Sequence, residues 1–313
     1  MVSTLLIVLP VFALIFVGWL SRRIGALGPN ATSELNRFVV YLALPALLFD
    51  VMAHAHFADI WRPGFIAAYS LGCLFVFALA LGLSLRRSPH LADAAIDGLN
   101  ASYANTGYMG FPLAALALGD AAMTPALIAT IVTVCVLFAL AIALIEAGLQ
   151  SEKHPARLVA SVVGAVVKNP LVAAPVLGAC IPLSGLAIPP SVESFLKLLG
   201  GAASPCALVA LGLFLAEKRE TTRREPAKTA ILVGFKLVLH PVLTWILAAL
   251  VFRLPPLLAH SAVLFAALPT GTGPFMLAEF YDREADITAK AVLYSTIVSV
   301  LTISIYLALA MRA

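Results

Sequence analysis

"NTGYMGFP" occupies residues 105–112 of a 313-residue chain, inside a stretch that is otherwise apolar enough to cross a membrane. Three of its residue types weaken or break helices. Backbone groups that a break sets free cannot face lipid, because lipid offers them no hydrogen-bond partner. The stretch is therefore either a loop or a functional interruption of a membrane helix.

The composition of the chain shows whether this stretch belongs to a membrane protein or to a soluble one. Hydrophobic residues make up 62% of the chain and charged residues only 12%, whereas a soluble domain carries about 25% charged residues. The sequence therefore predicts an all-α integral membrane protein without a sizeable soluble domain. The net charge of +4 is spread over short connections, which indicates topology signals rather than a nucleic-acid surface.

Ten stretches are long and apolar enough to span a bilayer, which takes about 20 residues. They are residues 3–21, 37–54, 63–85, 93–118, 121–146, 169–188, 192–216, 229–252, 257–281 and 287–311. Residues 149–168 form the predicted cytoplasmic connection, in which polar residues spaced three and four apart up to Lys168 indicate a helix on the membrane surface. "KNP" then opens the sixth span, with Asn169 as the cap and Pro170 in the first turn.

The basic residues support this count. With ten spans, fifteen of the twenty lysines and arginines fall on one side of the membrane, four fall on the other, and Lys236 lies within a span. Cytoplasmic loops are enriched in basic residues, so both termini are predicted to lie outside. We expect the protein in a bacterial cytoplasmic (inner) membrane.

The two halves of the chain, residues 1–148 and 169–313, resemble each other. The second and seventh spans each carry a mid-span proline, in "ALPALLF" (43–49) and "ASPCALVALG" (203–212), and the fourth and ninth carry "NTGYMGFP" and "PTGTGP" (269–274). Because five spans is an odd number, the second half must insert upside down. Inverted repeats with interrupted helices are a recurring plan of secondary transporters, which place the substrate where the interruptions meet.

The two interruptions predict an anion site. If Pro112 and Pro274 lie in the first turns of the resumed helices, two helix N-termini, each with roughly half a positive charge, point toward the protein centre. Glycines there let a ligand approach the backbone, and Tyr108 could stack on an organic substrate or simply pack. The predicted binding residues of the two interruptions are Asn105, Thr106, Gly107, Tyr108, Gly110, Pro112, Pro269, Thr270, Gly271, Thr272, Gly273 and Pro274.

Four ionisable residues are candidates for coupling or charge compensation, because such residues within spans are often functional. Lys236 could extend its side chain to the cytoplasmic surface, or act with His240 on substrate or protons. Asp50 lies near the outer end of the second span, where a structural or gating contact is expected, and Glu279 lies near the cytoplasmic end of the ninth. "DVMAHAHFAD" (50–59) lacks a recognised ligand spacing, so no metal is expected there.

Sequence motifs of enzymes are not found. The chain has no G-x-S-x-G, H-E-x-x-H or P-loop pattern, so neither an enzyme nor an ATP-driven pump is predicted, and no cofactor is expected. The four cysteines are scattered singly and are expected to be small packing residues rather than metal ligands or disulfide partners.

The chain resembles the auxin efflux carrier family of bacterial and plant transporters over essentially its whole length. The resemblance rests on "LNRFVVYLALPALLF" (35–49), "NTGYMGFPLA" (105–114), "KNPL" (168–171), "GGAASPCALVALGLFLA" (200–216), "KLVLHPVL" (236–243) and "LPTGTGPFMLAEFY" (268–281). The family resembles bile-acid symporters and sodium/proton antiporters in architecture.

This resemblance implies two bodies. Helices 1, 2, 6 and 7 would form a scaffold that also dimerises, and helices 3–5 and 8–10 a moving transport domain with helices 4 and 9 crossing at their breaks. Substrate would be held there and against helix 2 between Pro45 and Phe49. The chain lacks the long central hydrophilic loop of many plant members, and "LPALLFDVMAHA" (44–55) is similar to malonate-type dicarboxylate carriers of bacteria.

Three functions remain open at this stage. The first is a secondary carrier that moves a small organic anion by an elevator-like mechanism, driven by potential or by coupling. The second is a sodium- or proton-coupled symporter of the bile-acid type, which an acidic residue beside the crossing would favour. The third is a membrane sensor that binds a ligand without moving it.

Overall fold

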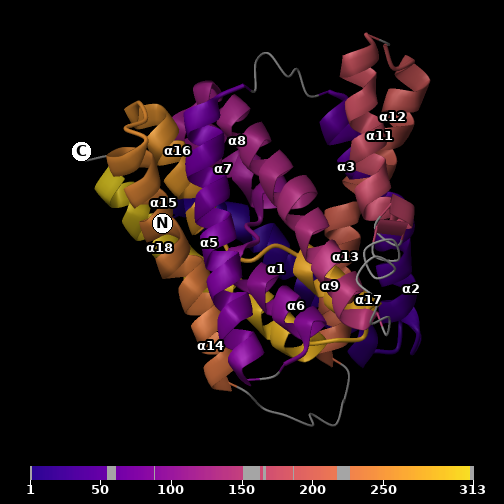
Figure 1. The fold of residues 1–313 in the computed structure, drawn as a ribbon. Coiled ribbons are helices and arrows are strands. Elements are labelled where there is room, and N and C mark those ends of the chain that lie inside the picture. The colour runs from indigo at the N-terminus through magenta and orange to yellow at the C-terminus, as the bar shows by residue number, and fades with distance from the viewer. Residues whose placement is uncertain are drawn as a thin grey trace.

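The computed structural model describes residues 2–54, 61–87, 89–150, 163–164, 167–185, 187–216 and 226–310. These residues are mostly helical, and no strand occurs among them (Figure 1). The segments of the first half, with short π and 3-10 turns written as η, are α1 (Val2–Arg23), α2 (Ala31–Phe38), η1 (Val39–Ala43), α3 (Leu44–Ala53), α5 (Pro63–Arg87), α6 (Leu91–Ser102), η2 (Thr106–Gly110), α7 (Phe111–Leu118), η3 (Asp120–Ala122), α8 (Met123–Thr130), η4 (Ile131–Leu137) and α9 (Phe138–Leu149).

The segments of the second half follow the central connection. They are α11 (Pro170–Ser184), α12 (Pro190–Gly201), α13 (Ala203–Ala216), α14 (Pro226–Gly234), η5 (Phe235–Leu239), α15 (His240–Trp245), η6 (Ile246–Val251), α16 (Pro256–Ala267), α17 (Gly273–Phe280) and α18 (Ala285–Ala310).

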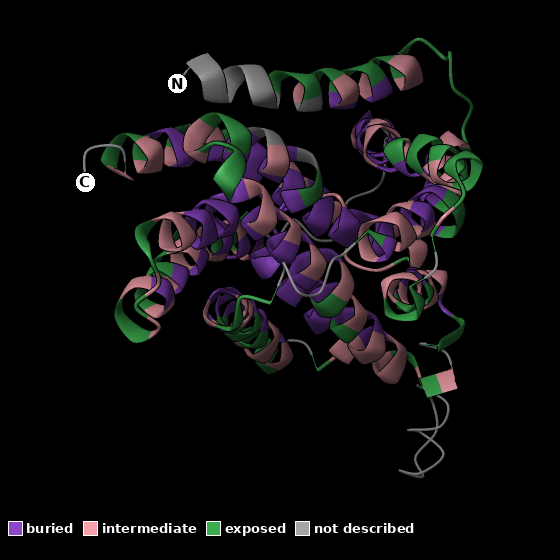
Figure 2. Cartoon of the chain, turned by 90° about the horizontal axis from the view of Figure 1, so that it is seen from above, coloured by how far each residue is buried: buried purple, intermediate pink, exposed green. Residues whose placement is uncertain are grey.

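The helices are long and apolar enough for a membrane protein. Six helical stretches of the described chain could cross a bilayer by length and composition, and α11 and α16 are shorter apolar helices. Large apolar side chains face outward, as in Leu183, Phe195 and Leu198, and buried residues gather toward the middle of the bundle (Figure 2). Such an outer surface suits lipid rather than water.

Two helix beginnings bear on the sequence predictions. The sixth stretch opens as predicted, since Asn169 caps α11 by accepting a hydrogen bond of 3.0 Å from the amide of Leu171. The second begins at Ala31 rather than at residue 37, because its first turns carry polar residues that a hydropathy count excludes. The predicted surface helix of the central connection lies largely outside the described residues.

The helices pack in two groups. In the first, α1 packs on α13, and α3 packs on α11 and α12, which stand together on the right of Figure 1. Glycines allow these close approaches: a Cβ atom added to Gly18 would lie 2.1 Å from the Val209 carbonyl, and one added to Gly178 would lie 2.4 Å from that of Phe49. In the second group, α5 packs on α6, α6 on α9, α15 on α16 and α14 on α18.

Ion pairs at one end of the second group join the two halves of the chain. Arg283 donates to both oxygens of Asp93 on α6, at 2.5 and 3.1 Å. Lys228 on α14 lies 2.8 Å from Asp97 on α6 and 2.8 Å from Glu284. Helix α6 is therefore fixed to the second half by charge as well as by packing.

Candidate functional site

Two helices are interrupted, and their interruptions pair with each other. Helix α6 ends at Ser102 and α16 ends at Ala267, and the extended segments that follow form an antiparallel bridge between Ala104 and Thr270. The amide of Asn105 donates to the Pro269 carbonyl at 2.9 Å, and the amide of Gly271 donates to the Tyr103 carbonyl at 3.1 Å. Backbone N–H and C=O groups that have no helical partner at one break thus form hydrogen bonds with those at the other break. We call residues 103–105 and 268–272 the crossing.

The first break lies earlier than the sequence suggested. Pro112 lies in the first turn of α7, as predicted, but helical structure already resumes at Thr106, as the π-type turn η2, and continues into α7. Proline has no amide hydrogen, and the chain passes it with an irregular turn before α7 rather than with a break. In the second break, Pro274 does occupy the first turn of α17.

A cavity of about 220 Å³ lies beside the crossing. Four predicted binding residues border it: Asn105 and Gly107 from the first break, and Thr272 and Gly273 from the second. The opposite wall comes from the first helix group, and it includes Leu44, Leu47, Gly200, Gly201, Ser204 and Pro205. The cavity therefore lies between the interrupted helices and the group formed by α3, α12 and α13.

The remaining predicted residues of the breaks whose side chains are described do not border the cavity. The Thr270 hydroxyl donates to the Asn100 carbonyl at 2.8 Å, and its amide donates to the Ser295 hydroxyl at 3.0 Å. Gly110 packs near Leu268, and Thr106 is buried. The Pro269 carbonyl accepts the bond from Asn105. The side chains of Tyr108 and Pro112 lie outside the described part.

The part of the cavity wall that the second predicted span provides, through α3, differs in detail from the prediction. Pro45 and Phe49 are partly buried, but the residues of α3 that border the cavity are Leu44 and Leu47. These positions lie on another face of the same helix, since neighbours along a helix point about 100° apart. The predicted helix thus contributes to the wall through other side chains.

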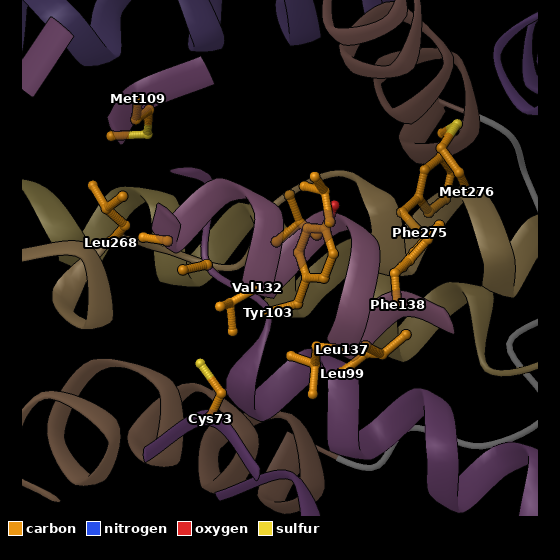
Figure 3. Packing of buried hydrophobic residues seen from close by; sticks show 14 of the residues in the cluster. Cys73, Leu99, Tyr103, Met109, Val132, Leu137, Phe138, Leu268, Phe275 and Met276 are labelled. Atoms are coloured by element: carbon orange, nitrogen blue, oxygen red, sulfur yellow. The ribbon is translucent and has the colours of Figure 1, made fainter. Parts of the chain in front are cut away.

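Several cavity residues were missed in the sequence. The ring of Tyr103 packs on Phe138 with 5.4 Å between ring centroids (Figure 3). A Cβ atom added to Gly271 or Gly273 would lie 2.8 Å from Tyr103 atoms, so these glycines make room for the ring. Gly200, Gly201 and Ser204 stand in "GGAASPC" (200–206), a stretch that supports the repeat and the family resemblance but was not predicted to bind substrate. The matching prolines of the two halves could have indicated that this stretch also faces the centre.

The electrostatic setting of the cavity comes from backbone rather than from charged side chains. None of the described residues that border it is charged, and its polar side chains are those of Asn105, Thr272 and Ser204, besides the Tyr103 hydroxyl group. Gly107 in η2 and Gly273 at the start of α17 border it, so the amide ends of two helices are near. Helix N-termini favour anions and offer unpaired N–H donors.

Lys236 is buried deep within the second helix group. Its side chain is fully inaccessible to solvent, and its Nζ donates to the Ala266 carbonyl at 2.6 Å and lies 3.2 Å from His240 Nδ1. The His240 Nε2 atom lies 3.4 Å from Cys73 Sγ. Of the two alternatives drawn from the sequence, extension to the membrane surface is therefore excluded.

The two other ionisable candidates lie away from the cavity. Asp50 pairs with His54 at 3.1 Å, and His54 lies 3.6 Å from Glu193 on α12, so this cluster joins α3 to α12. Glu279 is partly buried in the last turn of α17. Among the described residues, no group of three or more histidine, cysteine or acidic side chains could hold a metal ion. His56 and Asp59 lie outside the described residues.

Comparison with known proteins identifies the family. The model of the family described as "Membrane transport protein" matches residues 4–307. The chain belongs to this family, which includes the auxin efflux carriers. It is 35% identical to a Rhizobium meliloti protein named "Putative malonate transporter", over 95% of this chain and 93% of that protein. It is 27% identical to the Escherichia coli "Uncharacterized transporter YfdV", over 88% of this chain and 87% of that protein.

A plant relative matches over a shorter part of the chain. "Auxin efflux carrier component 8" of Arabidopsis thaliana is 30% identical over 122 residues, which are 39% of this chain and 33% of that protein. The recognition of the auxin efflux carrier family from sequence motifs is thus confirmed, and this membrane transporter is not an enzyme.

Proposed function

We propose that this transporter moves a small organic anion, bound in the cavity beside the crossing, by an elevator-like change between the two sides of the membrane. One observation supports this most directly: the first turns of both resumed helices, at Gly107 and Gly273, border the same cavity. Two helix N-termini and neutral donors suit a carboxylate, because they stabilise negative charge without a fixed ion pair.

The architecture that goes with this function is one of ten spans in two inverted five-helix repeats. Matched distortions support it. In the first half, η1 precedes Pro45 in the first turn of α3, and in the second half α12 ends just before Pro205 in the first turn of α13. Each half also contributes one interrupted helix to the crossing. Both termini would then lie outside the cytoplasmic membrane of a bacterium.

Two bodies would move relative to each other. The scaffold would consist of α1, α2, α3, α11, α12 and α13, and the transport body of the segments from α5 to α9 and from α14 to α18. The packing of helices into two groups, with the cavity between them, is in keeping with this division. The scaffold would also form the interface of a homodimer, as the family resemblance implies.

The substrate class that we propose is a malonate-type dicarboxylate. The printed name of the Rhizobium meliloti relative points to malonate for that protein, and a cavity of about 220 Å³ would accommodate a small dicarboxylate. No acidic side chain is found among the described residues that border the cavity, so a sodium ion held by a carboxylate there is not favoured.

The test is uptake of radiolabelled malonate and of monocarboxylates into liposomes that contain the purified protein. Gradients of pH, sodium and voltage are imposed one at a time. Malonate uptake above that of empty liposomes is the expected result, and the gradient that drives it identifies the coupling. Binding of malonate without uptake would support a sensor instead, and uptake of cations without any organic anion would overturn the proposal.

A further inference from the structure

Among the described residues, no acidic side chain lies near the side-chain nitrogen of Lys236. The neighbours of its Nζ are the Ala266 carbonyl and His240. The titratable groups beyond them are Cys73, which contacts His240, and Tyr69, which lies near His240 with 6.2 Å between ring centroids and bonds to Thr133. None of these is an acid that would be ionised at neutral pH.

The geometry suits an ammonium ion. Ala266 stands in the last turn of α16, where the helix ends in carbonyl groups with a partial negative charge. A distance of 2.6 Å to this carbonyl is as short as charge-assisted hydrogen bonds are. His240 offers Nδ1 as an acceptor if its proton is on Nε2, which faces the Cys73 sulfur. The site thus offers two acceptors and a helix end to a cation, but no full negative charge.

An isolated charge within a membrane protein is costly unless it is compensated. Lys236 lies in η5, which packs against α5, α6, α16 and α18 and therefore within the second helix group. The half-helix that it caps leads directly into the crossing, whose other side borders the cavity. An anion in the cavity would supply the missing negative charge.

We propose that Lys236 is the counter-charge of the transported anion: its ammonium ion moves with the loaded transport body and offsets one negative charge of the substrate. This inference rests on the proposed function. It assigns Lys236 a positioning role rather than direct contact with substrate. It also implies that a loaded monoanion crosses the membrane field with one unit of negative charge less than it would without Lys236.

The experiment measures exchange of labelled for unlabelled substrate across liposomes at 0 and 100 mV. Exchange involves only the loaded body, so its rate responds to voltage according to the charge that this body carries through the membrane field. The probes are malonate, a dianion near neutral pH, and malonamate, a monoanion of similar size. In the wild type, malonamate exchange should be the same at both voltages, and malonate exchange should slow about three- to fourfold at 100 mV when the barrier lies midway in the membrane field.

Removal of the Lys236 charge makes the loaded body more negative by one unit, and this changes how exchange depends on voltage. In Lys236→Gln, malonamate exchange should acquire the voltage response that malonate shows in the wild type. Lys236→Arg keeps the charge and should retain the wild-type pattern. A structural role alone would change the rate of exchange in Lys236→Gln but not its dependence on voltage.

Each outcome separates the two proposals. Exchange with the same voltage response in wild type and Lys236→Gln overturns the role of Lys236 and leaves the proposed function intact. If the substituted proteins do not fold, the wild type decides alone, because voltage-dependent malonamate exchange contradicts compensation by Lys236. Failure of the wild type to exchange either probe overturns the proposed substrate class and this inference with it.

Discussion

The amide of Gly271 donates to the Tyr103 carbonyl at 3.1 Å, and the Tyr103 ring lies against the same glycine. One residue of the first break therefore forms both a backbone bond and a side-chain contact with one residue of the second. A Cβ atom at position 271 would approach the ring carbon Cε1 to 2.8 Å. A side chain at this point would force the ring or the backbone of the crossing to shift.

Gly271→Ala should therefore destabilise the protein by about 1–3 kcal/mol, as overpacking of a tight interior does. Thermal unfolding of the purified protein in detergent measures this. Gly107→Ala is the matched control, because a Cβ atom there would meet nothing within 4 Å. A Gly271→Ala protein as stable as Gly107→Ala would contradict the tight contact.

Asn105→Ala should reduce transport at least about tenfold while the protein still folds. Asn105 borders the cavity where the first helix resumes, and a hydrogen bond to a charged ligand contributes about 1.5–3 kcal/mol. Its amide bond to Pro269 comes from the backbone and persists. The measurement is the initial rate of uptake into liposomes. Asn30→Ala, at an exposed position before α2, is the control, and unchanged uptake in Asn105→Ala would remove this side chain from the site.

The sequence predicted the interruptions and their pairing, but not which residues would face the cavity. Glycine, proline and polar residues in apolar stretches identify a break, because lipid cannot satisfy freed backbone. Whether Thr270 faces a ligand or the Asn100 carbonyl depends on the rotation of helices around it. For the same reason Leu44 and Leu47, rather than Pro45 and Phe49, border the cavity. The burial of Lys236 could not be predicted either, because the group that it bonds to, the Ala266 carbonyl of α16, lies 30 residues further along the chain.

Gly201→Ala should narrow the substrate range without loss of stability. Gly201 borders the cavity, and a Cβ atom there would meet nothing within 4 Å, so an added methyl group would occupy ligand space. We expect the ratio of uptake efficiency for malonate over methylmalonate to rise about tenfold, because one methyl group in a tight pocket has roughly that effect. Gly82→Ala on α5, also in open space, is the control. An unchanged ratio in Gly201→Ala would contradict the location of the substrate.

Lys228→Met should destabilise the protein by about 3–5 kcal/mol, because it leaves the buried Asp97 carboxylate without its cation. The second substitution Asp97→Asn should recover part of this loss, since it removes the uncompensated charge. Unfolding in detergent of the two single variants and the double variant measures the coupling. Lys197→Met breaks the exposed pair with Glu193 and should change stability little. If Lys228→Met were no less stable than Lys197→Met, the pair with Asp97 would have no role in holding α6 to α14.

Tyr281→Phe should speed substrate exchange severalfold, at most about tenfold. The Tyr281 hydroxyl donates to Glu146 at 2.7 Å and accepts from Asn169 at 3.4 Å, so it links the end of α9 to the start of α11. In the proposed mechanism these helices belong to different bodies, and movement must break the contact with Asn169. A hydrogen bond contributes about 0.5–1.5 kcal/mol, which bounds the gain in rate.

The control for Tyr281 is Tyr306→Phe. The Tyr306 hydroxyl bonds to His260 at 3.1 Å and joins α16 to α18, which the mechanism assigns to one moving body. Its loss should leave the exchange rate unchanged, because no such contact breaks during movement. Exchange measured at equal substrate concentration on both sides compares the variants directly. Equal effects of the two substitutions would show that the Tyr281 contact does not cross a moving boundary, and the division into two bodies would have to be redrawn there.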